Sequence, residues 1–138
     1  MKAISQSIEI MRYRSLQADA VKREEFVSTI KSKALIEDLS ITFDVATAKG
    51  LLRNPLISKK ELVHLARLDD NAVRALVLSH PKCPKNLLLK YASNPNHLIR
   101  KAIAERPILP KKVAKILRRD SVTEIRDLAT TASLRPKK

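Results

Sequence analysis

The strongest constraint on the fold is an internal repeat of 26 residues, which the prolines mark. Pro55, Pro81 and Pro107 lie 26 residues apart. A second series with the same step comprises Pro84, Pro110 and Pro136. The repeats align without a gap as segments 55–80, 81–106 and 107–132, and a further copy begins at 133–138. A fixed period of this length is typical of repeat proteins, in which each repeat packs on its neighbours.

Each repeat is predicted to form two short helices. The first begins near Ser58, Pro84 or Pro110, because serine caps helices and proline suits the first helical position. The second carries equivalent apolar positions at i, i+3 and i+4, namely Val73/Ile99/Ile125, Leu76/Ala102/Leu128 and Val77/Ile103/Ala129. It ends before the next proline, since a residue before proline disfavours the α conformation. Helices this short cannot bury their apolar faces alone, so we expect an all-α solenoid of stacked helix pairs.

The N-terminal part of the chain is less regular. Residues 32–54 fall in register with the repeat, with Ser32 aligned on Ser58, and are interpreted as a degenerate first repeat. Residues 1–31 are expected to form a helical cap, with a break near 17–20 and Asp19 as a helix cap. The cap and the solenoid of residues 32–138 then make one structural domain.

Composition excludes several other classes of protein. The single glycine, Gly50, leaves no glycine-rich phosphate-binding loop and argues against a mostly β fold. The single cysteine, Cys83, permits no internal disulfide, and its equivalents Ile57 and Leu109 are apolar, so we expect it to be buried. No signal-peptide pattern or membrane-spanning run is present, so a cytoplasmic, membrane-free protein is expected. We expect no metal or other cofactor.

Histidines give no sign of catalysis. His64, His80 and His97 lack the spacing to one another, or to carboxylates, that a metal site or a catalytic triad requires. We therefore expect that the protein is not an enzyme.

A Val-Arg or Ile-Arg pair opens each second helix, as in Val73-Arg74, Ile99-Arg100 and Ile125-Arg126. With the proline-started first helix and the polar turn, this pattern resembles the leucine-rich repeat variant family, a branch of the HEAT-like α-solenoids. The resemblance extends over residues 51–138 and, more weakly, over 32–50. It implies a right-handed superhelix in which one helix of each repeat can be a 3₁₀ turn. The chain lacks the cysteine cluster of that family's iron–sulfur protein, and it has no tryptophan for the aromatic cleft of the related DNA glycosylases.

Positive charge is concentrated in the C-terminal repeats. The chain has a net charge of +14, and residues 81–138 contain 15 Lys and Arg residues but only four Asp and Glu residues. So basic a surface attracts polyanions by long-range electrostatics. The partner is therefore expected to be nucleic acid or an acidic protein.

Two equivalent positions carry a cation in every complete repeat. Lys59, Lys85 and Lys111 begin the first helices, where the helix dipole is mildly unfavourable to cations, which favours a role in binding over one in solubility and assigns them to the candidate binding surface. The second series is Arg74, Arg100 and Arg126. Core residues flank these arginines, which favours a structural ladder bonded to turn carboxylates such as Asp70 and Asp120 over contact with phosphates.

Other cations in the repeats add to this charge. Those assigned to the candidate binding surface are Lys90, Lys101, Arg106, Lys112, Lys115, Arg118 and Arg119. Aromatic side chains for base stacking are few, and Tyr91 is expected in the core, so contact with a duplex backbone is favoured within nucleic acids. The first hypothesis is a non-enzymatic protein that binds nucleic acid, in particular duplex DNA. The alternative is an interaction adaptor whose basic groove binds an acidic segment of another protein; the oligomeric state stays open.

Overall fold

The computed structural model describes residues 2–41 and 44–134, and it is predominantly helical, which confirms the predicted all-α class. The chain divides into two compact units, residues 1–73 and 74–138. The division falls within one helix, α6 (Asn71–Ser79). Of the further repeat expected at 133–138, residues 135–138 lie outside the described residues.

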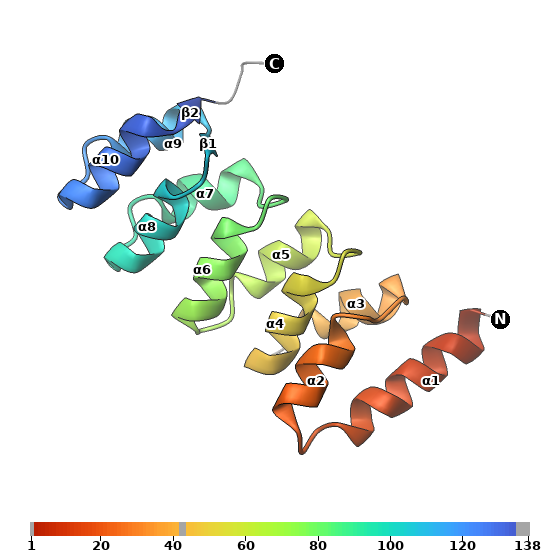
Figure 1. The fold of residues 1–138 in the computed structure, drawn as a ribbon. Helices are drawn as coiled ribbons and strands as arrows, with labels where there is room; N and C mark the ends of the chain where they lie inside the picture. The colour runs from red at the N-terminus through yellow and green to blue at the C-terminus, as the bar shows by residue number, and fades with distance from the viewer. Residues whose placement is uncertain (1, 42–43, 135–138) are drawn as a thin grey trace. The chain divides into compact units, whose positions relative to one another are not determined.

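Unit 1 is built from helices that pack in pairs (Figure 1). Its helices are α1 (Lys2–Ser15), α2 (Ala20–Val27), α3 (Lys33–Leu39), α4 (Val45–Arg53) and α5 (Lys59–Leu65), followed by the start of α6. Helix α2 contacts both α1 and α4, and α3 contacts α4. The fully buried aliphatic side chains Ile30, Ile36, Leu51 and Leu62 belong to the core of this unit.

The expected helix starts of unit 1 are largely confirmed. Asp19 caps α2 by accepting a hydrogen bond from the backbone N–H of Lys22, and the Ser32 hydroxyl caps α3 by accepting from Leu35. Ser58 stands at the N-cap of α5, but its hydroxyl donates to the Glu61 carboxylate and accepts no backbone N–H there.

Gly50 lies at a close approach between α4 and α2. A Cβ atom at this position would lie 2.6 Å from the Glu24 carbonyl oxygen and 2.7 Å from the Val27 Cβ. Both contacts are shorter than van der Waals separation, and the first is with the backbone of α2, which cannot move aside cheaply. The single glycine of the chain is therefore required by helix packing and not by a turn.

The variant Gly50→Ala is expected to lower the free energy of unfolding by roughly 1–3 kcal/mol, because the methyl group overpacks the α2–α4 contact. In an exposed helix the same change increases stability by up to about 1 kcal/mol. Urea denaturation therefore distinguishes the two cases by sign, and increased stability of Gly50→Ala would contradict the close approach.

Unit 2 contains the C-terminal helices and one pair of very short strands (Figure 1). After the end of α6 it comprises α7 (Lys85–Tyr91), α8 (His97–Ala104), β1 (Ile108–Leu109), α9 (Lys111–Leu117), α10 (Thr123–Thr131) and β2 (Ser133–Leu134). Helix α7 contacts α9, and α8 contacts α10, so the unit has two layers of neighbouring helices. The strands β1 and β2 pair in parallel, and the Ser133 N–H donates to the Pro107 carbonyl.

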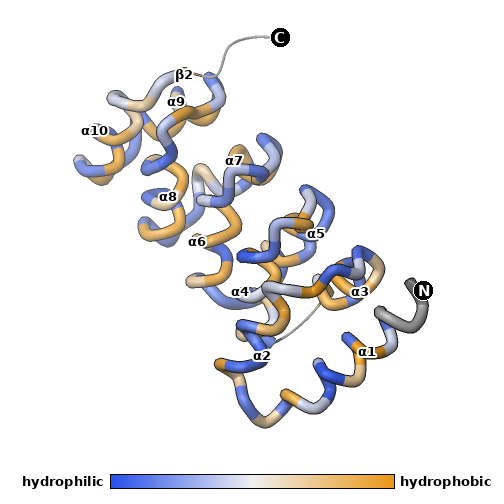
Figure 2. Tube along the Cα trace, turned by 45° about the vertical axis from the view of Figure 1, so that its right-hand side comes forward, coloured by the Kyte–Doolittle hydropathy of each residue, from blue (hydrophilic) through white to orange (hydrophobic). Residues whose placement is uncertain are grey.

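Most of the predicted core positions of α8 and α10 are buried. Ile99, Ile103, Ile125 and Ala129 are inaccessible to solvent. Figure 2 shows the corresponding alternation of polar and apolar residues along these helices. At these positions the structure has α-helices, in place of the 3₁₀ turns that the family resemblance allowed.

Leu76 is a wrong core prediction, because 47% of its surface is exposed. Helix α6 buries both Val77 and Leu78, so its buried face is rotated away from Leu76. The equivalent Ala102 is 8% exposed, and Leu128 is half-buried, so this position lies at the edge of the apolar stripe.

A proline stands immediately before both α7 and α9, preceded in α7 by Cys83. Pro84 and Pro110 occupy the N-cap positions, one residue before the expected first helical position. Cys83 is only 3% exposed, which confirms its predicted burial.

Candidate nucleic-acid interface

Helices α7 and α9 expose lysines on the side that faces away from their core residues. Helix α7 buries Leu87 and Leu88 and exposes Lys85 and Lys90. Helix α9 buries Val113, Ala114 and Leu117, and its exposed charged residues are Lys111, Lys112 and Lys115. Exposed Arg119 follows α9 in the next turn. We call this set of six cations, Lys85, Lys90, Lys111, Lys112, Lys115 and Arg119, the α7–α9 surface.

The carboxylates of unit 2 lie elsewhere in the unit. Neither α7 nor α9 contains Asp or Glu. The four acidic residues of unit 2 are Glu105 at the end of α8, Asp120 in the turn before α10, and Glu124 and Asp127 within α10. The two layers therefore differ in charge, and the α7–α9 layer is the positive one.

The cations of the α7–α9 surface are free to meet a ligand. Across residues 2–41 and 44–134, none of the six forms an ion pair with a carboxylate. Lys90 lies over the Tyr91 ring, with its Nζ 5.6 Å from the ring centroid. Exposed cations that form no ion pair with a carboxylate attract an anionic partner.

Arg118 and Lys101 are placed differently from these six. The Arg118 side chain donates from Nε to the Ala129 carbonyl of α10, at 3.1 Å, so it is anchored at the border of the surface. Lys101 of α8 forms an ion pair with Glu124 at 3.0 Å and a longer one with Glu105 at 3.8 Å. The hydrogen bond with Glu124 raises the pKa of Lys101 above its ordinary value. The charge of Lys101 is thus balanced by carboxylates of the α8–α10 layer.

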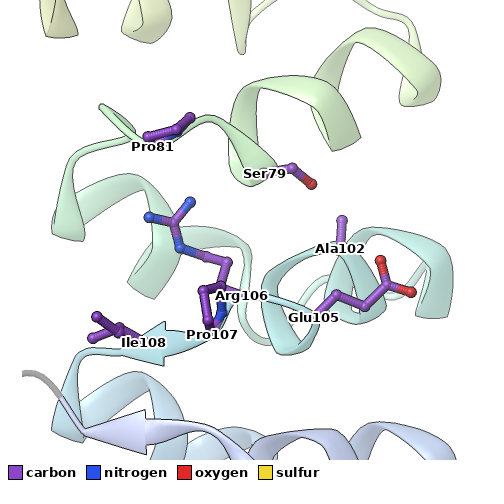
Figure 3. Close-up of a pocket in the computed structure, with 7 residues that line it drawn as sticks. All are labelled: Ser79, Pro81, Ala102, Glu105, Arg106, Pro107 and Ile108. Carbon is purple, nitrogen blue, oxygen red and sulfur yellow. The ribbon is translucent and has the colours of Figure 1, made fainter.

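Arg106 also lies apart from the α7–α9 surface. From the end of α8 its side chain extends toward the turn that carries Pro81 (Figure 3), and its Nη1 donates to the carbonyls of Leu78 at 2.8 Å and His80 at 2.9 Å. Asn54 makes an equivalent contact in unit 1, donating to the Val27 and Ile30 carbonyls. Arg106 therefore ties consecutive turns together, and we leave it out of the surface.

A hollow of about 560 Å³ lies beside Arg106. Its walls are the seven residues labelled in Figure 3, among them the rings of Pro81 and Pro107 and the side chains of Glu105 and Ile108. Because the Arg106 guanidinium already donates to two main-chain carbonyls, we assign the hollow no binding role.

Lys59 belongs to unit 1. It is the exposed first residue of α5, as Lys85 and Lys111 are of α7 and α9. Lys33 is the exposed first residue of α3, and the sequence analysis missed it. The alignment of Ser32 on Ser58 already contained the signal, because it places Lys33 on Lys59.

The arginines at equivalent repeat positions, Arg74, Arg100 and Arg126, make structural contacts in unit 2. Arg100 binds the Asp120 carboxylate with two hydrogen bonds, from Nε at 2.7 Å and from Nη2 at 3.1 Å, and its Nη1 donates to the Asn94 carbonyl at 2.7 Å. Arg126 donates to the Asp120 carbonyl at 2.7 Å, and Arg74 lies 5.6 Å from the centroid of the Tyr91 ring. Asp70, expected as a partner of this series, accepts the N–H of Val73.

Unit 1 contains the same arrangement as Arg100 and Asp120. Arg23 of α2 binds Asp44 through Nε at 2.6 Å and Nη2 at 3.1 Å, and its Nη1 donates to the Gln17 carbonyl at 2.8 Å. Sequence alignment missed this pair, because the 26-residue step places Lys22 on the arginine position. Counted from the N-cap, however, Arg23 and Arg100 both stand four residues into their helices.

The two Arg–Asp pairs make the free energy of unfolding depend on pH in the acidic range. Hydrogen bonds from Arg23 and Arg100 hold the pKa values of Asp44 and Asp120, respectively, below their ordinary value of 3.8. A lowered pKa in the folded state stabilises the protein above the unfolded pKa, and this contribution is lost as the pH falls through the folded value.

We therefore expect the free energy of unfolding to decrease as the pH falls below about 4, and the variant Asp120→Asn to weaken that pH dependence. Urea denaturation between pH 2.5 and 6 measures both; an unchanged pH dependence in Asp120→Asn would contradict the assignment.

Tyr91 is only half-buried, which corrects its expected place in the core. The guanidinium of Arg74 and the ammonium of Lys90 each lie 5.6 Å from the centroid of its ring. This arrangement leaves little free aromatic face for base stacking.

One histidine has a serine partner that the sequence spacing did not indicate. The Ser40 hydroxyl lies 2.9 Å from Nδ1 of His64 and donates its proton to the Glu37 carbonyl at 2.6 Å. Ser40 is 1% exposed, and its contact with the half-buried His64 lies at the edge of the core.

The part of the chain that the structure describes holds no group of three or more His, Cys, Asp or Glu side chains placed to bind a metal ion. In the same residues, no helix has both the length and the apolar character needed to cross a lipid bilayer. Comparison with protein-family models, curated proteins and solved structures finds no match to this chain.

Proposed function

We propose that this chain is a non-enzymatic repeat protein that binds duplex DNA through the α7–α9 surface. The observation that carries the proposal is the separation of charge within unit 2. All four carboxylates of the unit lie on or beside α8 and α10, whereas α7 and α9 expose lysines and no acidic residue. A surface with one sign of charge attracts a polyanion and orients it.

The proposed repeat architecture rests on the positions at which the helices begin. Helices α3, α5, α7 and α9 begin at residues 33, 59, 85 and 111. Helices α4, α6, α8 and α10 begin at residues 45, 71, 97 and 123. Both series advance by 26 residues, which supports a solenoid of two-helix repeats; the right-handed superhelix is what the family resemblance adds.

A duplex is favoured over a single strand because the surface offers charge but little stacking. Proteins that bind single strands combine a basic groove with exposed aromatic side chains. Tyr91 is the aromatic residue next to the α7–α9 surface, and Arg74 and Lys90 lie over its ring. The α7–α9 surface is therefore better suited to contact phosphates through its lysines than to stack on bases.

Titration of a fluorescently labelled 20-bp duplex with the full chain tests the proposal. If the six cations each meet a phosphate, the logarithm of the affinity falls with the logarithm of salt concentration with a slope of about −5. The affinity should then fall by about three orders of magnitude between 50 and 200 mM salt.

A labelled poly-glutamate of the same charge serves as the comparison for the adaptor alternative. Duplex binding with the expected salt dependence and weaker binding of the acidic polymer support the proposal. Failure to bind the duplex at 50 mM salt, together with tight binding of the acidic polymer, would replace DNA by an acidic protein as the partner.

A further inference from the structure

If α7 and α9 bind duplex DNA as proposed above, their dimensions determine which parts of the duplex they can contact. Each helix has seven residues and is therefore about 10 Å long. The two helices contact each other. Neighbouring helices pack about 8–10 Å apart, and each is about 10–12 Å in diameter with its side chains. The pair thus forms a layer roughly 20 Å across.

A layer of this width cannot enter a DNA groove. The major groove of B-DNA is about 12 Å wide and accepts one helix, not two side by side, and the minor groove is about 6 Å wide. Helices α7 and α9 contact each other side by side, so neither helix stands clear of the other to enter alone. The layer must therefore rest on the phosphates at the groove rims.

From the rims, the side chains of the surface are too short to reach the bases. The five bonds from Cα to Nζ of lysine, each about 1.5 Å long, span roughly 6 Å. The floors of the major and minor grooves lie about 8.5 and 7.5 Å deep. Asn86, which is also exposed on α7, is shorter than lysine, and Arg119, which is one bond longer, lies beyond the end of α9.

We infer that the α7–α9 surface contacts only the sugar–phosphate backbone of the duplex, so that its binding is independent of base sequence. Lysine suits such a role, because its ammonium group is a compact point charge without the planar fork with which arginine reads guanine.

Selection from a library of 20-bp duplexes with random sequence tests the inference. The full chain is immobilised at 50 mM salt, and the retained duplexes are amplified and sequenced over several rounds. We expect retention without enrichment of any motif, and affinities of individual retained and discarded duplexes that agree within about threefold. An enriched motif that binds more than tenfold tighter than its scrambled version would overturn the inference and leave the proposed function standing.

Two further outcomes complete the test. The variant Lys85→Gln/Lys111→Gln should lower the affinity for unrelated sequences by the same factor, because it removes phosphate contacts alone; a loss confined to particular sequences would overturn the inference. If the chain retains no duplex of any sequence at 50 mM salt, both the inference and the proposed function fail.

Discussion

Replacing Arg100 by alanine is expected to lower the free energy of unfolding by about 3 kcal/mol, because it leaves the Asp120 carboxylate buried without its partner. The Asp120 side chain is 5% exposed, and the Arg100 side chain is 13% exposed. The substitution also removes the donor to the Asn94 carbonyl. For a chain of this size the melting temperature should fall on the order of 10 °C, as measured by thermal unfolding followed by circular dichroism.

The matched control is Arg119→Ala, which removes the same charge from an exposed site in the same unit. It should change the melting temperature by no more than about 2 °C, since exposed charges contribute little to stability. Adding Asp120→Asn to Arg100→Ala should recover part of the loss, because the orphaned charge is then gone. Equal melting temperatures for Arg100→Ala and Arg119→Ala would contradict the structural role of Arg100.

Reversal of two surface charges, Lys85→Glu/Lys111→Glu, is expected to weaken duplex binding on the order of 60-fold at 0.1 M salt. Each lost phosphate contact removes about 0.9 from the slope of log affinity against log salt concentration. Over the tenfold range between 1 M and 0.1 M salt, two lost contacts therefore lower the affinity by about this factor. The slope itself should become shallower by about 2. Both lysines are exposed, so the melting temperature should hardly change.

Lys22→Glu/Lys31→Glu is the matched control, since it makes the same change in net charge at exposed positions of unit 1. A fall in affinity that depends only on net charge would be equal in the two double variants. The proposal requires a much larger fall for Lys85→Glu/Lys111→Glu, and equal losses would contradict a defined surface on α7 and α9.

The helices were predictable because their signals are local and repeated. The caps Asp19 and Ser32 and the fully buried Ile99 and Ile125 follow from side-chain chemistry and from periodicity, both of which can be read along the chain. Leu76 was wrongly predicted to be buried, because the rotation of helix α6 about its axis buries Leu78 in its place. Periodicity alone does not resolve that competition.

The candidate site was predictable only as an excess of charge. Counting cations cannot tell which of them already has a partner, so it placed Lys101 and Arg106 with the exposed lysines. Their contacts with Glu124 and with main-chain carbonyls depend on tertiary structure. Arg23 was missed for the opposite reason, since a shift of one residue in the alignment hides it although its geometry repeats that of Arg100.

Chemical-shift perturbation of the backbone amides by a 20-bp duplex tests the proposed interface most directly. With the ¹⁵N-labelled full chain at 50 mM salt, we expect the largest perturbations in residues 85–90 and 111–119, and small ones in α8 and α10. Largest perturbations in α8 and α10, or none anywhere in the chain at saturating duplex, would contradict the assignment of DNA binding to the α7–α9 surface.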